Sequence, residues 1–341
     1  MPGARSARLC LVLRGGLAAA VWRASNPMRS FVLALIAALA LSAADPRPGW
    51  AAGLAHHAGT VTTDDGAIGY ETFGPGAGGA ASGRLPVIVA NGGPGLTHAY
   101  MMLNDLWPRV ARDRLVVVYD PRGLGASRHI KPGAPQTLAA QVADLEALRA
   151  ALKLDRIAVV GDSFGGLVAM AYACDHPDRV ARLVLSDSVP PRSKDMVHLL
   201  PDAFPDVEAQ DAADMTRLGP TTEAAARVSL RDHFRMIFYA PAKRDAYLAR
   251  MGDLGFDPAV GAAVTKATAD VDLTERVKAL TMPTLVLTGR YDLNVAPIVA
   301  WRMAHEIPHA RYVVFEQSGH LPAYEEPGAY RAVLERFLDA P

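Results

Sequence analysis

The sequence predicts a doubly wound α/β fold, in which helices cover both faces of a mostly parallel sheet, with an inserted helical cap. Three observations predict it. Short runs of Val, Ile and Leu without polar alternation recur along the chain, as in strands that are buried on both faces. Segments with helical periodicity separate these runs. One long interval, 190–280, contains helical patterns and no convincing strand, which indicates a cap over the sheet edge where such folds bind ligands.

The core is expected over residues 59–189 and 281–341, with the cap at 190–280 between them. It begins with a hairpin over 61–73, and a glycine-rich loop follows at 74–83. Short apolar runs then predict the strands of the parallel sheet: 85–90, 115–119, 157–160, 183–186, 284–288 and 312–315.

Helical periodicity is clearest over 137–152 in the core and over 222–238 in the cap. In the first of these segments the apolar residues fall on one face: Leu138, Val142, Leu145 and Leu148. His56 and His57 precede the first expected strand, and we expect them to be mobile.

The composition favours a small binding partner. Of the 341 residues, 50% are apolar, which is enough for a large core. Lys plus Arg and Asp plus Glu balance at 35 each, and no basic cluster stands out, so nucleic acid is not expected as a partner. The expected partner is a small-molecule or short-peptide substrate.

Residues 1–52 are expected to be a targeting segment that acts as a secretory signal. Met28 and Arg29 provide a basic start, and an apolar run follows over 31–41. Small residues that suit cleavage follow at 42–44 or at 49–51. The apolar run is short for a membrane span, although an uncleaved anchor is the alternative.

We expect Met28 to be the true start, with residues 1–27 upstream of it. The signal predicts a secreted or periplasmic protein with no stable membrane insertion once the signal is cleaved, or a membrane-anchored one if it is not. After cleavage Cys174 is the remaining cysteine, so no intramolecular disulfide is expected.

The stretch Gly161-Asp162-Ser163-Phe164-Gly165 matches G-x-S-x-G between an expected strand and an expected helix. A sharp turn at this point presses the residues two before and two after the serine together, so neither carries a Cβ easily. The turn would project the Ser163 hydroxyl into the cleft as a nucleophile. The alternative is an ordinary turn in which Ser163 caps a helix.

A serine nucleophile needs a base, and the base needs a third group that fixes its tautomer. Asp292 follows the strand at 284–288, and His320 follows the strand at 312–315. All three groups then lie past the carboxyl ends of strands at one edge of the sheet, in the order that is typical of serine hydrolases with this topology. The alternatives are a solvated turn residue and a loop histidine.

A tetrahedral intermediate needs hydrogen-bond donors for its oxyanion. The backbone N–H of Phe164 is one candidate, at the start of a helix. The second candidate is the N–H of Gly93, in the stretch Asn91-Gly92-Gly93-Pro94-Gly95 after the strand at 85–90. The alternative for this stretch is a plain Gly-Pro turn.

Taken together, these motifs resemble the α/β-hydrolase superfamily, and most of all its proline iminopeptidase branch. The motifs that carry the resemblance are Asn91-Gly-Gly-Pro-Gly95, Asp120-Pro-Arg-Gly-Leu-Gly-Ala-Ser127, Gly161-Asp-Ser-Phe-Gly-Gly166, Gly289-Arg-Tyr-Asp292 and Ser318-Gly-His320. The resemblance covers about residues 80–341. It implies a serine hydrolase that removes an N-terminal residue, usually proline, from peptides.

The resemblance also implies cap glutamates that pair with the free amine of the substrate, for which Glu208 and Glu223 are the candidates. The chain departs from the branch at Asn91, where the branch has His, and at Pro121, where it has Gln. It also has Gly-Asp-Ser-Phe-Gly where the branch has Gly-Gly-Ser-Trp-Gly.

We therefore predict an aminopeptidase that releases proline or a small residue. The alternatives are a carboxylesterase or lactonase with the same triad, and a catalytically silent ligand-binding protein. No cofactor is expected, because Gly123 and Gly125 lack the third glycine of a dinucleotide site. No metal is expected, because the chain has no H-E-x-x-H motif and no cysteine cluster. Asp120 and Arg122 are expected to brace loops around the cleft.

Overall fold

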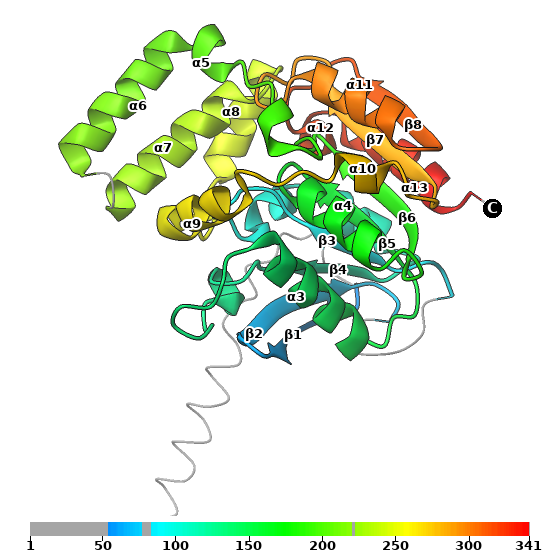
Figure 1. The fold of residues 1–341 in the computed structure, drawn as a ribbon. Coiled ribbons are helices and arrows are strands. Elements are labelled where there is room, and N and C mark those ends of the chain that lie inside the picture. Colours follow the sequence, from blue (N-terminus) through cyan, green and yellow to red (C-terminus); the bar gives the residue numbers. More distant parts are fainter. Residues whose placement is uncertain (1–53, 77–82, 220–221, 341) are drawn as a thin grey trace, which may run out of the picture. The chain divides into compact units, whose positions relative to one another are not determined.

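A computed structural model describes residues 54–76, 83–219 and 222–340 (Figure 1). Contacts divide the chain into two units, Met1–Pro48 and Gly49–Pro341, and all described residues belong to the second. The predicted signal segment and the start at Met28 lie outside the described residues. None of the described helices combines the length and the hydropathy that a bilayer span requires.

The described residues form an eight-stranded sheet with the order β1-β2-β4-β3-β5-β6-β7-β8. Pairing is parallel from β4 through β8, and β2 pairs antiparallel with both β1 and β4. The strands are β1 His56–Thr63, β2 Gly66–Phe73, β3 Val87–Ala90, β4 Val116–Tyr119, β5 Ile157–Asp162, β6 Val180–Ser186, β7 Thr284–Gly289 and β8 Ala310–Phe315. The predicted mostly parallel α/β sheet is confirmed.

The predicted hairpin is present, but β1 begins earlier than expected. Its first residues, His56 and His57, pair with Phe73 and Thr72 of β2. The expectation that the two histidines are mobile was therefore wrong. The physical reason is that an edge strand is held by backbone pairing, which polar residues can make as well as apolar ones.

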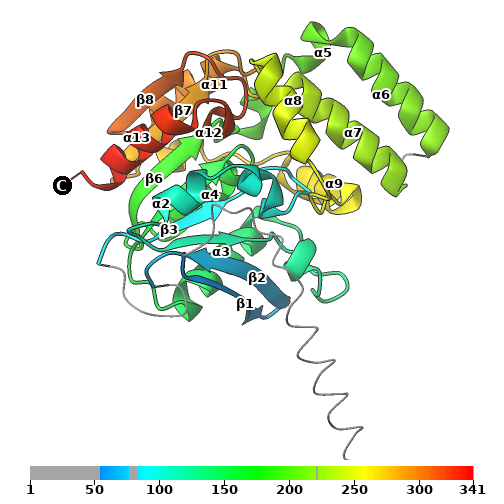
Figure 2. The same cartoon turned by 180° about the vertical axis from the view of Figure 1, so that it is seen from behind.

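Two layers of helices bury the central strands (Figures 1 and 2). One face carries α3 (Leu138–Ala151), α4 (Gly165–Asp175) and α11 (Pro297–Glu306). The other face carries α2 (Leu106–Val110) and α13 (Pro327–Leu338). Every residue of β3, β4 and β5 is buried, which explains why these strands lack polar alternation.

Helix α3 shows how the sequence specifies a covering helix. Thr137 caps its N-terminus by accepting a hydrogen bond from the N–H of Ala140. The predicted apolar face is buried against the sheet through Leu138, Val142, Leu145 and Leu148. Each such leucine stabilises the fold by about 2 kcal/mol.

Between β6 and β7 the described chain is helical. It contains η4 (Ser193–Asp195), α5 (Leu200–Ala203), α6 (Pro205–Leu218), α7 (Glu223–Met236), α8 (Pro241–Arg250), α9 (Pro258–Thr268) and α10 (Thr274–Val277). An apolar cluster joins α7 and α8 to the segment after β3 through Leu96, Tyr100, Phe234, Tyr247 and Leu254. The helices of this interval are thereby held next to the loops at one edge of the sheet.

The carboxyl ends of the parallel strands lie along that edge. Ser163 follows β5, Asp187 follows β6, Asp292 lies just past β7, and His320 lies past β8. Because parallel strands end on the same side of a sheet, residues distant in sequence come together there.

Candidate active site

Ser163 lies on a strained turn between β5 and α4. Its φ is +52°, in the left-handed region that residues with a Cβ rarely adopt. A Cβ on Gly161 would lie 2.5 Å from the carbonyl oxygen of Gly165, so this position requires glycine. A Cβ on Gly166 would overlap the Ser188 side chain. The glycines thus allow the close turn that the sequence predicted.

The structure brings Ser163, His320 and Asp292 into one hydrogen-bonded chain. The His320 Nε2 atom lies 3.0 Å from Ser163 Oγ. The His320 Nδ1 atom lies 2.7 Å from Asp292 Oδ2. An ionised carboxylate only accepts, so Nδ1 carries the proton and Nε2 is free to accept the serine proton.

Backbone groups fix Asp292 in turn. Its Oδ1 atom accepts hydrogen bonds from the N–H groups of Asn294 and Val295, each at 2.9 Å. The two carboxylate oxygens therefore have separate partners. Rotation of the side chain would break all three bonds.

The cap and α12 (Pro322–Glu325) hold the loop that carries the imidazole. The N–H of His320 donates to the carbonyl of Ile237 at 2.8 Å. Glu325 accepts from the N–H of Gly319 at 2.7 Å and from that of Ala240 at 2.8 Å. A displacement of residues 237–240 would therefore move the base.

Two histidines of the site have opposite pKa shifts. Burial lowers the pKa of His320, but the charges of Asp292 and Asp162 and the bond to Asp292 raise it above 6.5 overall. Burial, with a smaller effect of the charge on His320, lowers the pKa of His233 on α7 to about 4. His233 is therefore neutral at pH 7.

Asn294 also contacts the base, and sequence reasoning missed it. Its side-chain Nδ2 lies 3.0 Å from His320 Nε2, the atom that accepts the serine proton. Its backbone carbonyl is 3.0 Å from Nδ1 of His198 in the cap. The only signal in the sequence is its position two residues after Asp292.

Sequence reasoning also missed two buried acids beside the triad, Asp162 and Asp187. A carboxylate oxygen of Asp187 lies within 4.8 Å of the polar atoms of Asp292 and His320. Asp187 accepts from the N–H of Gly289 and from the hydroxyl of Ser186, each at 2.9 Å. Both acids directly follow or end a strand, which was their signal in the sequence.

Burial disfavours the charged form of both acids. Burial, and then the charge of Asp292, raise the pKa of Asp187 well above its usual value. Burial likewise raises the pKa of Asp162. Among the described residues, one group has ligand atoms close enough together to hold a metal ion: Asp187, Asp292 and His320. The absence of a metal thus remains a prediction.

The loop after β3 lies against the nucleophile. A Cβ on Gly92 would lie 2.8 Å from the Ser163 Cβ. The N–H of Gly92 donates to Tyr100 Oη at 2.6 Å, and the Tyr100 hydroxyl donates to Asp162. In the part of the chain that the structure describes, the N–H groups of Gly93 and Phe164 have no hydrogen-bond acceptor. Both N–H groups thus remain candidates for the predicted oxyanion donors.

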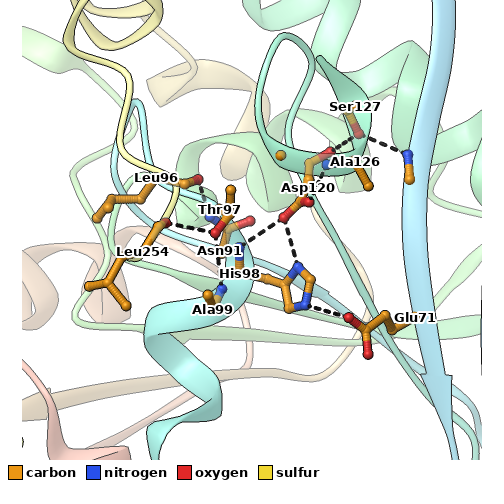
Figure 3. A network of polar contacts seen from close by, with 12 residues as sticks. Glu71, Asn91, Leu96, Thr97, His98, Ala99, Asp120, Ala126, Ser127 and Leu254 are labelled. Atoms are coloured by element: carbon orange, nitrogen blue, oxygen red, sulfur yellow. Dashed lines mark hydrogen bonds and ion pairs between the residues drawn. The ribbon is translucent and has the colours of Figure 1, made fainter. Parts of the chain in front are cut away.

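Arg122 braces the neighbouring loop after β4, as expected. Its guanidinium donates to both carboxylate oxygens of Asp144 at 2.7 Å and to Asp65 at 2.9 Å. Asp120 bonds to His98, which lies at the start of η2 (His98–Leu103) (Figure 3).

The two candidate amine-binding glutamates lie on the cap. Glu223 is 80% exposed and pairs with Arg227 at 2.7 Å. With Arg231 and Asp253 it lines a cavity of about 370 Å³ that no triad residue lines. Glu208 is half-buried on α6. Neither carboxylate bonds to a triad residue within the described ranges.

Comparison with known proteins identifies the class. Residues 86–327 match the family model described as alpha/beta hydrolase fold. The chain therefore belongs to the α/β hydrolase fold family.

The relatives with a similar sequence include proline iminopeptidases. The chain is 32% identical to a proline iminopeptidase of Lactiplantibacillus plantarum, over 80% of this chain and 98% of the relative. It is 30% identical to a proline iminopeptidase of Levilactobacillus brevis, over 80% of this chain and 94% of the relative.

Solved structures with a similar fold include esterases. A thermophilic esterase from Thermogutta terrifontis has a TM-score of 0.62 and 26% identity, over 83% of this chain and 98% of that chain. A proline iminopeptidase from Mycobacterium smegmatis has a TM-score of 0.58 and 24% identity, over 83% of this chain and 97% of that chain.

Proposed function

We propose that the protein is a serine hydrolase that uses Ser163, His320 and Asp292 as a catalytic triad. Ser163 Oγ attacks an acyl carbonyl while His320 Nε2 takes its proton. His320 then donates this proton to the leaving group as the acyl bond breaks. Water, activated by the same imidazole, releases the acyl group from Ser163.

The observation that carries this proposal is the continuous chain of hydrogen bonds from Asp292 through His320 to Ser163 Oγ, at 2.7 and 3.0 Å. The free N–H groups of Gly93 and Phe164 would receive the negative charge that develops on the carbonyl oxygen. The left-handed turn at Ser163 supports the same role, because strain of this kind costs about 1–3 kcal/mol and marks functional sites.

For the substrate, we propose a peptide with N-terminal proline or another small residue. The relatives that are named proline iminopeptidase support this choice, because the sequence similarity covers nearly their whole length. The candidates for binding the substrate amine are Glu208 and Glu223.

A carboxylesterase or lactonase is the second candidate. The observation that favours it is the pairing of Glu223 with Arg227, which neutralises one of the two carboxylates offered for an amine. The 26% identity to the Thermogutta terrifontis esterase supports it as well.

The test compares three substrates: prolyl-2-naphthylamide, its N-acetyl derivative, and p-nitrophenyl acetate. An aminopeptidase cleaves the free prolyl amide and loses at least about 100-fold in kcat/KM when the amine is blocked. Strict preference for the ester, with no dependence on a free amine, would instead establish the esterase.

The triad itself is tested with Ser163→Ala. This variant should lose about 10⁶-fold in kcat on the preferred substrate. Ser193→Ala, in η4, is the matched control, because its hydroxyl bonds to the carbonyl of Thr268 and not to the triad. If Ser163→Ala kept most of the activity, the proposed mechanism would be rejected.

A further inference from the structure

The seven residues between β3 and η2 (His98–Leu103) carry the Gly93 N–H, and a partly buried ionic cluster fixes their far end (Figure 3). The cluster consists of Glu71 on β2, His98 at the start of η2, and Asp120 after β4. The His98 side chain is only 12% exposed.

The geometry favours a charged His98. Its Nδ1 lies 2.7 Å from Asp120 Oδ1, and its Nε2 lies 3.4 Å from Glu71 Oε1. An ionised carboxylate supplies no proton, so Nδ1 donates to Asp120, and the ion pair with Glu71 is favourable only when Nε2 carries a proton as well. An imidazole with a proton on each nitrogen is an imidazolium cation.

The two carboxylates have further partners that hold them in place. Asp120 accepts the backbone N–H of His98 at 3.2 Å and the N–H of Ala126 at 2.8 Å. Glu71 lies 2.7 Å from Nε2 of His56 on β1. His98 thus ties η2 to β2 and to the residue that follows β4, and Glu71 and Asp120 are the charged groups that face it.

Other hydrogen bonds link η2 to residues 91–97, the segment that contains Gly93. Asn91 Nδ2 donates to the carbonyl of Leu96 at 2.9 Å, which closes the loop on itself. The Thr97 hydroxyl donates to the carbonyl of Leu254 at 2.7 Å, which joins the loop to the cap. Tyr100 of η2 accepts the N–H of Gly92 at 2.6 Å. A shift of η2 would therefore shift the residues on either side of the Gly93 N–H.

We propose that His98, held as an imidazolium between Glu71 and Asp120, is a positioning residue that fixes the Gly93 N–H where the oxyanion forms. This inference rests on the proposed hydrolase function. His98 does not touch the reacting atoms. It acts through η2, and its loss should lower kcat more than it raises KM, because the oxyanion exists only along the reaction.

The ionic cluster gives the proposal a pH signature. Burial lowers the pKa of His98, but its bonds to Asp120 and Glu71 raise it to about 9 overall. The interaction with His98 lowers the pKa of the Glu71 carboxyl group to about 2. Because the folded-state pKa of His98 lies above 6.5, the contribution of the cation is complete below about pH 6.5 and is lost as the pH rises through about 9.

The test uses the second-order rate at which an uncharged fluorophosphonate labels Ser163, from about pH 6 to about pH 10.5. His98→Asn keeps a donor near Asp120 but removes the charge. Glu71→Gln keeps the His98 imidazole but removes one of the two carboxylates that face it. This variant also provides the test if His98→Asn fails to fold. The exposed His129→Gln is the control. Hydrogen exchange of residues 91–97 is followed in all variants.

The wild-type rate should fall at alkaline pH with a midpoint near 9. Glu71→Gln should move this midpoint down by about one pH unit. His98→Asn should label about 10- to 100-fold more slowly and lack the alkaline fall. Both variants should exchange faster over residues 91–97, whereas His129→Gln should match the wild type.

The proposal is overturned if both cluster variants label within about twofold of the wild type and keep its alkaline midpoint. If the wild type does not label at Ser163, the proposed function fails. The exchange measurement then still decides the role of His98: faster exchange over residues 91–97 supports it, and unchanged exchange overturns it.

Discussion

Replacing Asp292 by Asn keeps the size of the side chain and tests what the carboxylate does. In the wild type, Oδ1 accepts two backbone N–H groups and Oδ2 accepts the Nδ1–H of His320. An Asn side chain has one oxygen and one NH₂ group, so it can satisfy only one of these two sides.

The structure predicts which of these two hydrogen-bonding partners, the backbone N–H groups or the imidazole, the substituted side chain no longer satisfies. If the NH₂ group faced the N–H groups of Asn294 and Val295, two buried donors would be left unpaired, at about 1–3 kcal/mol each. The oxygen should therefore stay with the backbone, and the NH₂ group should point at His320 Nδ1. The imidazole then carries its proton on Nε2, facing Ser163, where it cannot accept the serine proton.

The expected loss in kcat for Asp292→Asn is about 10⁴-fold, with little change in KM. The assay is hydrolysis of whichever test substrate the wild type prefers, with circular dichroism to confirm folding. Asp178→Asn, at a 70% exposed position, is the control. A folded Asp292→Asn variant that kept more than about one-tenth of the activity would refute the reasoning. The double variant with Asp187→Asn shows whether the nearby second acid supplies any residual rate.

Three further predictions concern the base and the loop beside it. The base is neutral His320, and its pKa lies above 6.5. For an uncharged ester, kcat/KM should therefore show an acid limb, a fall at low pH, with its midpoint above 6.5. A midpoint below 6.5 would contradict this prediction. Gly92→Ala places a Cβ 2.8 Å from the Ser163 Cβ, so kcat should fall at least about 100-fold while the variant stays folded, and activity within a few-fold of the wild type would count against the contact. Asn294→Ala removes an N–H that stabilises neutral His320, so the acid limb should move to higher pH in the same ester assay; a downward move would mean that the amide oxygen faces Nε2.

The sheet was predictable because its strands are buried on both faces and so consist of uninterrupted apolar residues. The start of β6 was not, since Ala181 and Arg182 are partly exposed and interrupt the apolar run. The start of β1 was missed for a similar reason, because the segment around His56 and His57 is held by backbone pairing at the sheet edge. Hydrophobic pattern detects burial and does not detect pairing.

The grouping of Ser163, Asp292 and His320 was predictable because each follows a parallel strand, and the topology alone brings such residues together. Asp187 and Asn294 occupy similar positions but resemble ordinary turn residues, so their contacts appear only in three dimensions. The pairing of Glu223 with Arg227 had a signal that sequence reasoning passed over, since a glutamate four residues before an arginine on a helix commonly forms an ion pair.

The most direct test of the central claim is mass spectrometry of the folded wild-type protein after reaction with a fluorophosphonate. The account predicts one phosphonyl adduct on the peptide that contains Ser163, and no adduct in Ser163→Ala. An unlabelled wild type, or equal labelling of Ser163→Ala at another residue, would contradict it.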